Sequence, residues 1–381
     1  MAGRTCGDMD TPASVAAAAP AHDEIGNLLV HLEGARGRFS GTLINYSIPC
    51  TASENSRCQI VASIPLWNEF LCWLELELRE LSGGKLALAH VRKICCPRPT
   101  QSEVRQAPAI LYVLLRTHSC ATSIQIPNYS DDSEIVHLWN TYPRTDRSVI
   151  ADFCSSVLCT DDSEIANLCS AVLGNVLDGN HAVKSVTLEV SSGSLQIERV
   201  FHVLLSIKGL EELHCEVSSW DKVISTTILA LLRDSATLTA FDVIAPRIEN
   251  AHSGLLVRAL RANSTLRDLT LSSSDVAVEP ELFVAFMSST VTLKRLKVVG
   301  NRCAVEYAML KRIFQGMLKN LTVSSLEAHE LCVHKANVKL GAKMLAQNKV
   351  LRSFSLLHCS YVSFNMSREE ITAARNSINA S

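Results

Sequence analysis

The segment ALRANSTLRDLTL, residues 259–271, places two hydrophobic periods side by side. Its first residues end a stretch in which apolar side chains recur at helical spacing, whereas Leu266, Leu269 and Leu271 follow the pattern LxxLxL of a strand with one buried face. Between them, the Asn-Ser-Thr sequence is expected to form a turn, with Asn263 in the left-handed backbone conformation that often ends a helix. We therefore interpret this segment as a corner between a helix and a strand.

The LxxLxL pattern recurs along the chain at a nearly constant interval. Its first apolar positions are 27, 28, 28, 27, 30 and 28 residues apart, and they are Val183, Leu210, Leu238, Leu266, Leu293, Val323 and Leu351. Weaker units begin upstream at Ile150 and at Ala121. One such unit cannot bury its own apolar face, so stacked units are expected, with the LxxLxL segments in a parallel sheet and the helical segments in an outer layer. The fold class predicted is an α/β solenoid.

Units of about 28 residues that end in NxTLxxLxL resemble the ribonuclease-inhibitor-type leucine-rich repeats of ribonuclease inhibitor and of NOD-like receptors. The resemblance covers residues 110–365 and implies a horseshoe with a parallel concave sheet and convex helices. It also implies Asn or Cys three residues after the last strand leucine. The chain matches there at Asn301 and Cys359, and differs at Ser218, Pro246, Ser274 and Leu331.

The two ends of the chain do not follow the period. Residues 1–22 are small and Ala-rich, and we expect a disordered tail. Residues 23–110 are interpreted as a mixed helical amino-terminal cap over the first repeat or as a small adaptor module, and residues 111–381 as the leucine-rich-repeat solenoid.

Within the amino-terminal region, residues 23–34 and 64–84 are predicted to be helical and residues 85–94 to form a strand. The mixed face of the second helix is made by Leu66, Phe70, Trp73, Leu74 and Glu77. At the other end, Ser367 and Glu370 have capping-box spacing, which predicts the start of a final helix. No polar capping segment follows, so we expect self-association or further chain to cover this edge.

Composition and motifs argue against several classes of function. A formal charge of −2 does not suit a nucleic-acid partner, and no apolar run is long enough to cross a membrane. The only Gly-Lys segment, LSGGKLA, lacks a P-loop glycine and serine, and no GxSxG or HExxH motif occurs. We therefore expect no enzymatic activity and no cofactor.

The fourteen cysteines are scattered without a CxxC pair, which favours free thiols and a cytoplasmic location. The six Asn-x-Ser/Thr sequons weigh slightly against that location. His118 and Cys120 form a lone pair, and we expect no metal site.

A protein partner remains, and its binding surface is expected on the concave face, where residues between the inward leucines collect. The candidates form an acidic band, neutral units and a basic band: Glu211, Glu212, His214, Glu216, Asp242, Thr270, Lys294, Arg295, Lys297 and Glu327. The resemblance implies non-catalytic protein binding, in innate-immune recognition or a similar cytoplasmic setting. The alternative is a substrate-recognition subunit of a ubiquitin ligase, recruited through residues 23–110.

Overall fold

The structure is a computed structural model, and it describes residues 40–46, 48–53, 56–91, 101–126, 181–190, 203–217, 222–245, 250–273, 279–300 and 307–361, with a few isolated positions. The expectations for residues 1–22, for the unit at Ile150 and for the helix start at Ser367 lie outside the described residues, as does almost all of the helix expected at 23–34. No helix in the described ranges is long and apolar enough to cross a membrane.

One ten-stranded sheet organises the described chain. Its strands, in spatial order, are β1 (Leu76–Glu80), β2 (Leu86–His90), β3 (Ala121–Ile126), β4 (Ser185–Val190), β5 (Glu212–Val217), β6 (Ala240–Ile244), β7 (Asp268–Ser272), β8 (Arg295–Val299), β9 (Ser325–His329) and β11 (Ser353–Leu357). The first pair is antiparallel, and every later neighbour is parallel. A second, two-stranded sheet joins β10 (Cys332–Val333) to β12 (Ser360–Tyr361).

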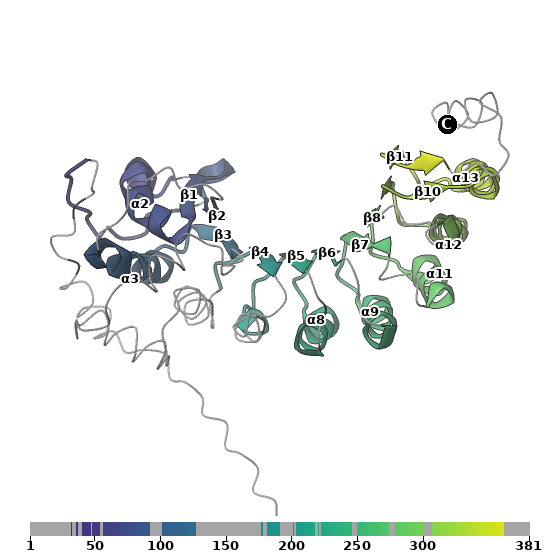
Figure 1. The fold of residues 1–381 in the computed structure, drawn as a ribbon, viewed down its shortest axis with the longest axis horizontal. Helices are drawn as coiled ribbons and strands as arrows, with labels where there is room; N and C mark the ends of the chain where they lie inside the picture. Colours follow the sequence, from purple (N-terminus) through teal and green to yellow (C-terminus); the bar gives the residue numbers. More distant parts are fainter. Residues whose placement is uncertain are drawn as a thin grey trace, which may run out of the picture.

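All of the α-helices with described bounds except the first connect parallel strands of the sheet. The α-helices are α2 (Ile64–Leu71), α3 (Gln101–Thr117), α8 (Lys222–Asp234), α9 (Asn250–Ala262), α11 (Pro280–Ser289), α12 (Tyr307–Met317) and α13 (Lys335–Gln347), with short 3-10 helices η1 (Gln59–Ser63), η2 (Cys72–Leu74) and η3 (Ser82–Gly84). Figure 1 shows the strands along the inner side of an arc and α8 to α13 along its outer side. Neighbouring outer helices contact one another. The α/β class, with a mostly parallel sheet, is confirmed.

The strands pair in the register that the LxxLxL spacing predicts. Leu269 lies opposite Phe241 on one side and Leu296 on the other, and this alignment extends from β3 to β11. The aligned apolar column is Ile124, Val186, Leu213, Phe241, Leu269, Leu296, Leu326 and Phe354. All but Phe354 are at least 98% buried, and Phe354 is partly buried against the same core. Because successive strand residues point to opposite faces, the residues between them are left on the inner surface of the arc.

Asparagine side chains hold the corners between helix and strand. Asn263 Nδ2 donates to the carbonyl of Leu232, at the end of α8, at 2.6 Å. Its Oδ1 accepts from the backbone N–H groups of Thr265 and Leu266 at 2.9 and 2.8 Å. The amide therefore joins its own corner to the helix of the preceding unit. The same arrangement is made by Asn320 and Asn348.

The expected left-handed backbone at Asn263 is wrong. Among the described non-glycine residues, positive φ angles occur at Glu75, Glu330 and His358. The side chain of Asn263, rather than its backbone, forms the turn, because one amide supplies both the donor and the acceptor that the corner lacks.

The helix expected over residues 64–84 is half wrong. Helical structure here is confined to α2, η2 and the three residues of η3, and Glu75, with a φ of 54°, ends η2. After it, Leu76 and Leu78 are buried and alternate with more exposed residues, so β1 follows the strand period and pairs with β2. Asn68 links α2 to this strand, because its Oδ1 accepts a hydrogen bond from the Leu78 N–H at 2.7 Å.

The strand expected over residues 85–94 is present as β2, and it pairs with β3. The large sheet therefore begins within the region interpreted as a cap or module. The boundary expected between residues 110 and 111 falls inside α3.

Candidate functional site

The inner strand surface brings many of the expected binding residues into one row. His214, Asp242, Thr270, Lys297 and Glu327 occupy the same position of five neighbouring strands and are paired in register. Each lies between two buried residues, and each is half-buried. We call these five residues the central row.

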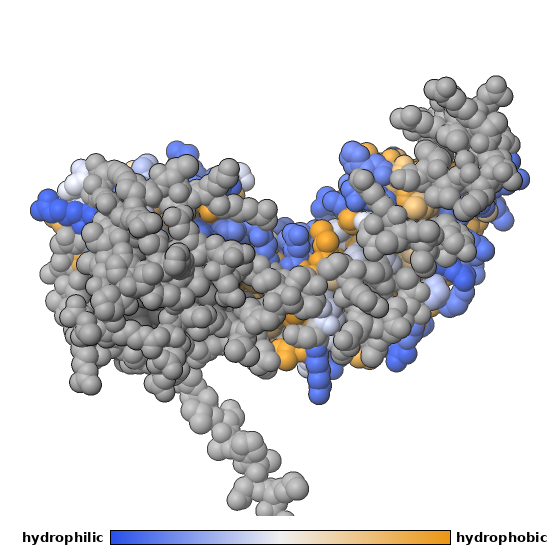
Figure 2. All heavy atoms as spheres, in the orientation of Figure 1, coloured by the Kyte–Doolittle hydropathy of each residue, from blue (hydrophilic) through white to orange (hydrophobic). Residues whose placement is uncertain are grey.

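The remaining expected residues flank the central row. Glu212 and Arg295 lie two positions before it on β5 and β8, and Glu216 lies two positions after it on β5. Glu211 and Lys294 precede their strands and are exposed, so Lys294 is not on β8 as expected. Figure 2 shows a hollow in this part of the arc, with hydrophilic residues where β4 and β5 lie.

Several charges on this surface are paired within the chain. The guanidinium of Arg295 donates two hydrogen bonds to the Asp268 carboxylate, one of them 2.6 Å long. Lys184 Nζ lies 3.0 Å from Glu211 Oε1. These contacts join neighbouring strands, and they reduce the free charge of both the acidic and the basic band. Among the described residues, Lys294 and Lys297 of the basic band form no ion pair.

His214 and Asp242 form a titratable pair in the central row. His214 Nδ1 lies 2.9 Å from Asp242 Oδ2. This hydrogen bond raises the pKa of His214 above its usual value, against the lowering effect of burial, and the charges of Asp242, Glu216 and Glu189 add to it. The surface over β4 to β6 is therefore acidic and partly balanced by His214.

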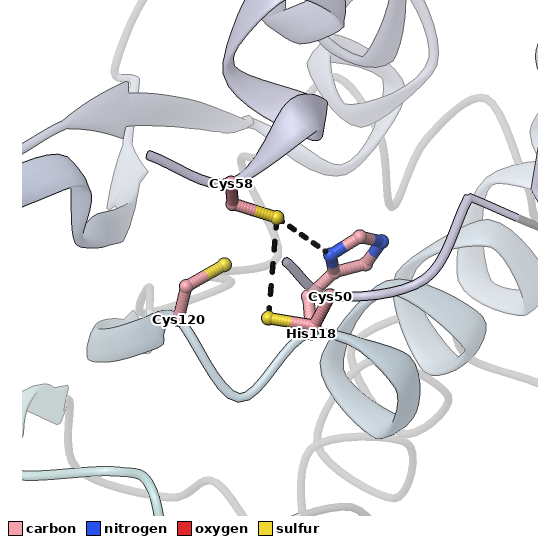
Figure 3. A group of neighbouring side chains, drawn as sticks. All are labelled: Cys50, Cys58, His118 and Cys120. Carbon is pink, nitrogen blue, oxygen red and sulfur yellow. Dashed lines mark hydrogen bonds between the residues drawn. The ribbon is translucent and has the colours of Figure 1, made fainter. Parts of the chain in front are cut away.

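A second group of side chains lies at the amino-terminal end of the sheet. Cys50, Cys58, His118 and Cys120, here called the Cys/His cluster, have ligand atoms that all lie within 4.8 Å of one another. Cys58 Sγ is 3.4 Å from His118 Nδ1 and 3.9 Å from Cys50 Sγ. Figure 3 shows the three sulfurs and the imidazole edge converging on one point.

Two segments supply the Cys/His cluster. Cys50 and Cys58 flank a loop in which Thr51 Oγ1 accepts from the Gln59 N–H and Ser56 Oγ donates to the Thr51 carbonyl. His118 and Cys120 lie between α3 and β3. Hydrogen bonds within this segment therefore hold Cys50 and Cys58 close together, and the segment packs against the α3–β3 corner.

The Cys/His cluster is mostly buried. His118, Cys58 and Cys120 are at most 4% exposed, and Cys50 is half-buried. Burial lowers the pKa of His118, which favours a neutral imidazole. Burial, and then the neighbouring Cys50 and Cys58, raise the pKa of the Cys120 thiol. The site therefore places three sulfurs and a neutral nitrogen together in a medium of low polarity.

Sequence reasoning missed the Cys/His cluster. It considered His118 with Cys120 as a lone pair and gave Cys50 and Cys58 no role. The available signal was two close pairs, Cys50 with Cys58 and His118 with Cys120, but neither has the two-to-four-residue ligand spacing typical of zinc sites.

No family model and no curated protein sequence matches this chain.

Proposed function

We propose that this chain is a leucine-rich-repeat protein of the ribonuclease-inhibitor type, and that it binds a protein partner, without catalysis, through the inner face of its sheet. The observation that carries the proposal is the central row, in which histidine, carboxylate, hydroxyl and ammonium groups lie in register across five neighbouring strands. A row of varied polar groups on a rigid sheet suits recognition of one extended surface.

The repeat assignment is supported by three features of the described strands. Parallel strands follow one another in chain order, the apolar column is continuous, and asparagines recur at the corners. Cys359 adds a fourth, since its Sγ donates to the Ala328 carbonyl of the preceding unit at 3.4 Å, as the family likeness implies for that position.

The partner proposed is a dipolar protein surface. Glu212 and Glu216 on β5 are exposed, and Lys294 and Lys297 lie three strands away beside and on β8. Opposite charges at this separation would orient a partner and raise its association rate more than its affinity.

A cytoplasmic location is part of the proposal. No disulfide joins the described cysteines, which are Cys50, Cys58, Cys72, Cys120, Cys215, Cys332 and Cys359. The amide nitrogens of Asn263 and Asn320 donate to backbone carbonyls, and Asn320 is 1% exposed, so neither sequon is accessible for a glycan in the folded chain. The pairing of β2 with β3 favours a capping role for residues 76–90 over a separate ligase adaptor.

The test compares two variants of equal charge change. Lys294→Glu with Lys297→Glu alters the inner surface, whereas Lys339→Glu with Lys343→Glu alters exposed positions of the outer helix α13. Proteins captured from native cells by the wild-type chain and the α13 variant, but lost from the inner-surface variant, identify partners of the inner face. For such a partner, we expect slower association and a weaker salt dependence with the inner-surface variant. Equal binding to both variants would place recognition elsewhere.

A further inference from the structure

The geometry of the Cys/His cluster matches that of a tetrahedral zinc site. With Zn–S bonds of about 2.3 Å and a Zn–N bond of about 2.0–2.1 Å, tetrahedral angles place two sulfurs about 3.8 Å apart and a sulfur about 3.6 Å from the nitrogen. The corresponding distances are 3.9 Å between Cys50 Sγ and Cys58 Sγ and 3.4 Å between Cys58 Sγ and His118 Nδ1. Two ligand-atom distances therefore match a tetrahedral zinc site, and all four donors lie within 4.8 Å of one another, close enough to converge on one ion.

The principal alternatives explain the arrangement less well. A disulfide requires sulfurs about 2.05 Å apart, and Cys50, Cys58 and Cys120 are all free. Buried cysteines commonly act as small apolar side chains, but that role does not account for a buried imidazole whose Nδ1 faces a thiol. The ring packs edge-to-face against Trp67, with the ring centroids 6.3 Å apart, and His118 Nε2 is buried without a hydrogen-bond partner among the described residues, so packing alone does not account for its polar atoms.

We propose that the Cys/His cluster binds one Zn²⁺ ion through three thiolate sulfurs and His118 Nδ1. On binding, the three thiols release three protons to solvent, and the neutral imidazole donates its Nδ1 lone pair while its proton lies on Nε2. Softness of the ligands favours this metal, because thiolate and imidazole together suit zinc and a carboxylate-preferring ion such as Mg²⁺ does not fit.

The site is structural rather than catalytic. Four protein donors complete the tetrahedral coordination of zinc and leave no position for substrate. The ion joins the loop of residues 50–58 to the α3–β3 corner. Cys120 also accepts a hydrogen bond from the Leu86 N–H through its carbonyl at 2.8 Å, so the ion lies beside the point where β2 meets β3. Zinc would therefore stabilise the amino-terminal end of the sheet.

Metal content of the full-length protein tests the proposal. After purification with reductant from zinc-supplemented cells, we expect about one zinc ion per wild-type chain by mass spectrometry of the elements. Cys58→Ser and His118→Ala should each lower the zinc content at least about fivefold. Cys72→Ser is the matched control, because Cys72 is half-buried in the same region and lies outside the Cys/His cluster. A zinc-free wild-type chain, or variants that retain all the zinc, would overturn the proposal.

X-ray absorption of the wild-type protein keeps the test valid if the variants fail to fold. The zinc edge should report three sulfur neighbours at about 2.3 Å and one nitrogen at about 2.0–2.1 Å. Replacement by Co²⁺ should give the intense visible bands of a tetrahedral ion and thiolate charge-transfer absorption. A shell of only oxygen and nitrogen neighbours, or a Cys50–Cys58 disulfide in anaerobically prepared protein, contradicts a thiolate zinc site.

Discussion

The corner before β3 and the corner before β7 use different chemistry at equivalent positions. His118 lies three residues before the first apolar position of its LxxLxL segment, and Asn263 lies three residues before that of the other. Asn263 Nδ2 donates to the carbonyl of Leu232 in α8 and its Oδ1 accepts from Thr265 and Leu266 within the corner, whereas His118 faces a thiol of an earlier segment. The corner before β3 therefore has a histidine beside a cysteine thiol where the corner before β7 has a neutral amide.

Because of this difference, we expect the two regions to respond differently to redox state and to metals. Amide hydrogen bonds in the β7, β9 and β11 corners depend on neither the redox state nor metals. The Cys/His cluster depends on both, because only a thiolate binds zinc. A chelator or an oxidant should thus act first on β2 and β3, and a corner substitution should act first on the carboxy-terminal strands.

The largest expected effect comes from Leu269→Asp. Leu269 is 2% exposed between Phe241 and Leu296, so the carboxylate would be buried without a partner, at a cost of at least about 4 kcal/mol. Stacked units contact only their neighbours, so β6, β7 and β8 should lose amide protection while β1 to β3 keep it. Hydrogen exchange measures both regions in one sample.

Thr270→Asp is the control for this prediction, since Thr270 neighbours Leu269 but points to the inner surface and is half-buried. Loss of protection throughout the sheet in Leu269→Asp would show that the two regions unfold as one unit.

The next effect concerns a corner. Asn320 is 1% exposed, and Asn320→Ala leaves the Met287 carbonyl and the N–H groups of Thr322 and Val323 without their partner, so we expect a loss of about 3 kcal/mol in unfolding free energy. Asn320→Ser should lose only about half of that, because Ser235 accepts from the two matching N–H groups with a hydroxyl in its own corner. Urea unfolding gives both values, and equal losses would contradict the role assigned to the amide acceptor.

A smaller effect is expected where the outer helices pack. A Cβ on Gly316 of α12 would lie 2.5 Å from Met287 Cβ of α11, so overpacking of about 2 kcal/mol exceeds the gain in helix propensity of about 1 kcal/mol. At Gly341 of α13, the nearest atom belongs to the Phe314 ring, at 2.9 Å, which is farther away and nearer the outer end of its side chain than the Met287 Cβ, so the clash is smaller. Gly316→Ala should therefore lower the unfolding temperature and Gly341→Ala should change it little. Similar shifts for both would contradict the tighter packing assigned to Gly316.

The parts of this molecule differ in how far sequence alone could reach. The spacing of Leu266, Leu269 and Leu271 determines which strand side chains face the buried core. The strand positions and the central row could therefore be predicted from the sequence. The structure of the segment after Trp73 could not be predicted in this way. Leu74 and Glu77 continue a helical spacing, whereas Leu76 and Leu78 already alternate as a strand.

The two sites illustrate a further limit. To predict the pairing of Asp268 with Arg295, one must know which two strands are neighbours. Their separation of 27 residues, one interval of the LxxLxL pattern, already indicated this. The Cys/His cluster needs more, since the loop at Cys50 and Cys58 reaches the α3–β3 corner only through tertiary packing that local periodicity does not encode.

The smallest effect is a pH dependence that arises at one pair of residues, His214 on β5 and Asp242 on β6. The raised pKa of His214 means that the folded chain binds this proton more tightly than the unfolded chain, whose histidines titrate near pH ~6.5. The stabilisation is therefore complete below about pH 6.5 and is lost as pH rises through the folded pKa of His214. Both side chains of the pair are about one-third exposed, at 35% and 32%, so solvent screening limits the effect to at most about 1 kcal/mol. Asp242→Asn should return the NMR titration of His214 toward its usual range and remove this part of the stability profile. Asp268→Asn, the same change on the next strand beside Arg295, should leave the titration of His214 nearly unchanged, and an equal shift in both variants would show that general charge rather than the Asp242 hydrogen bond raises this pKa.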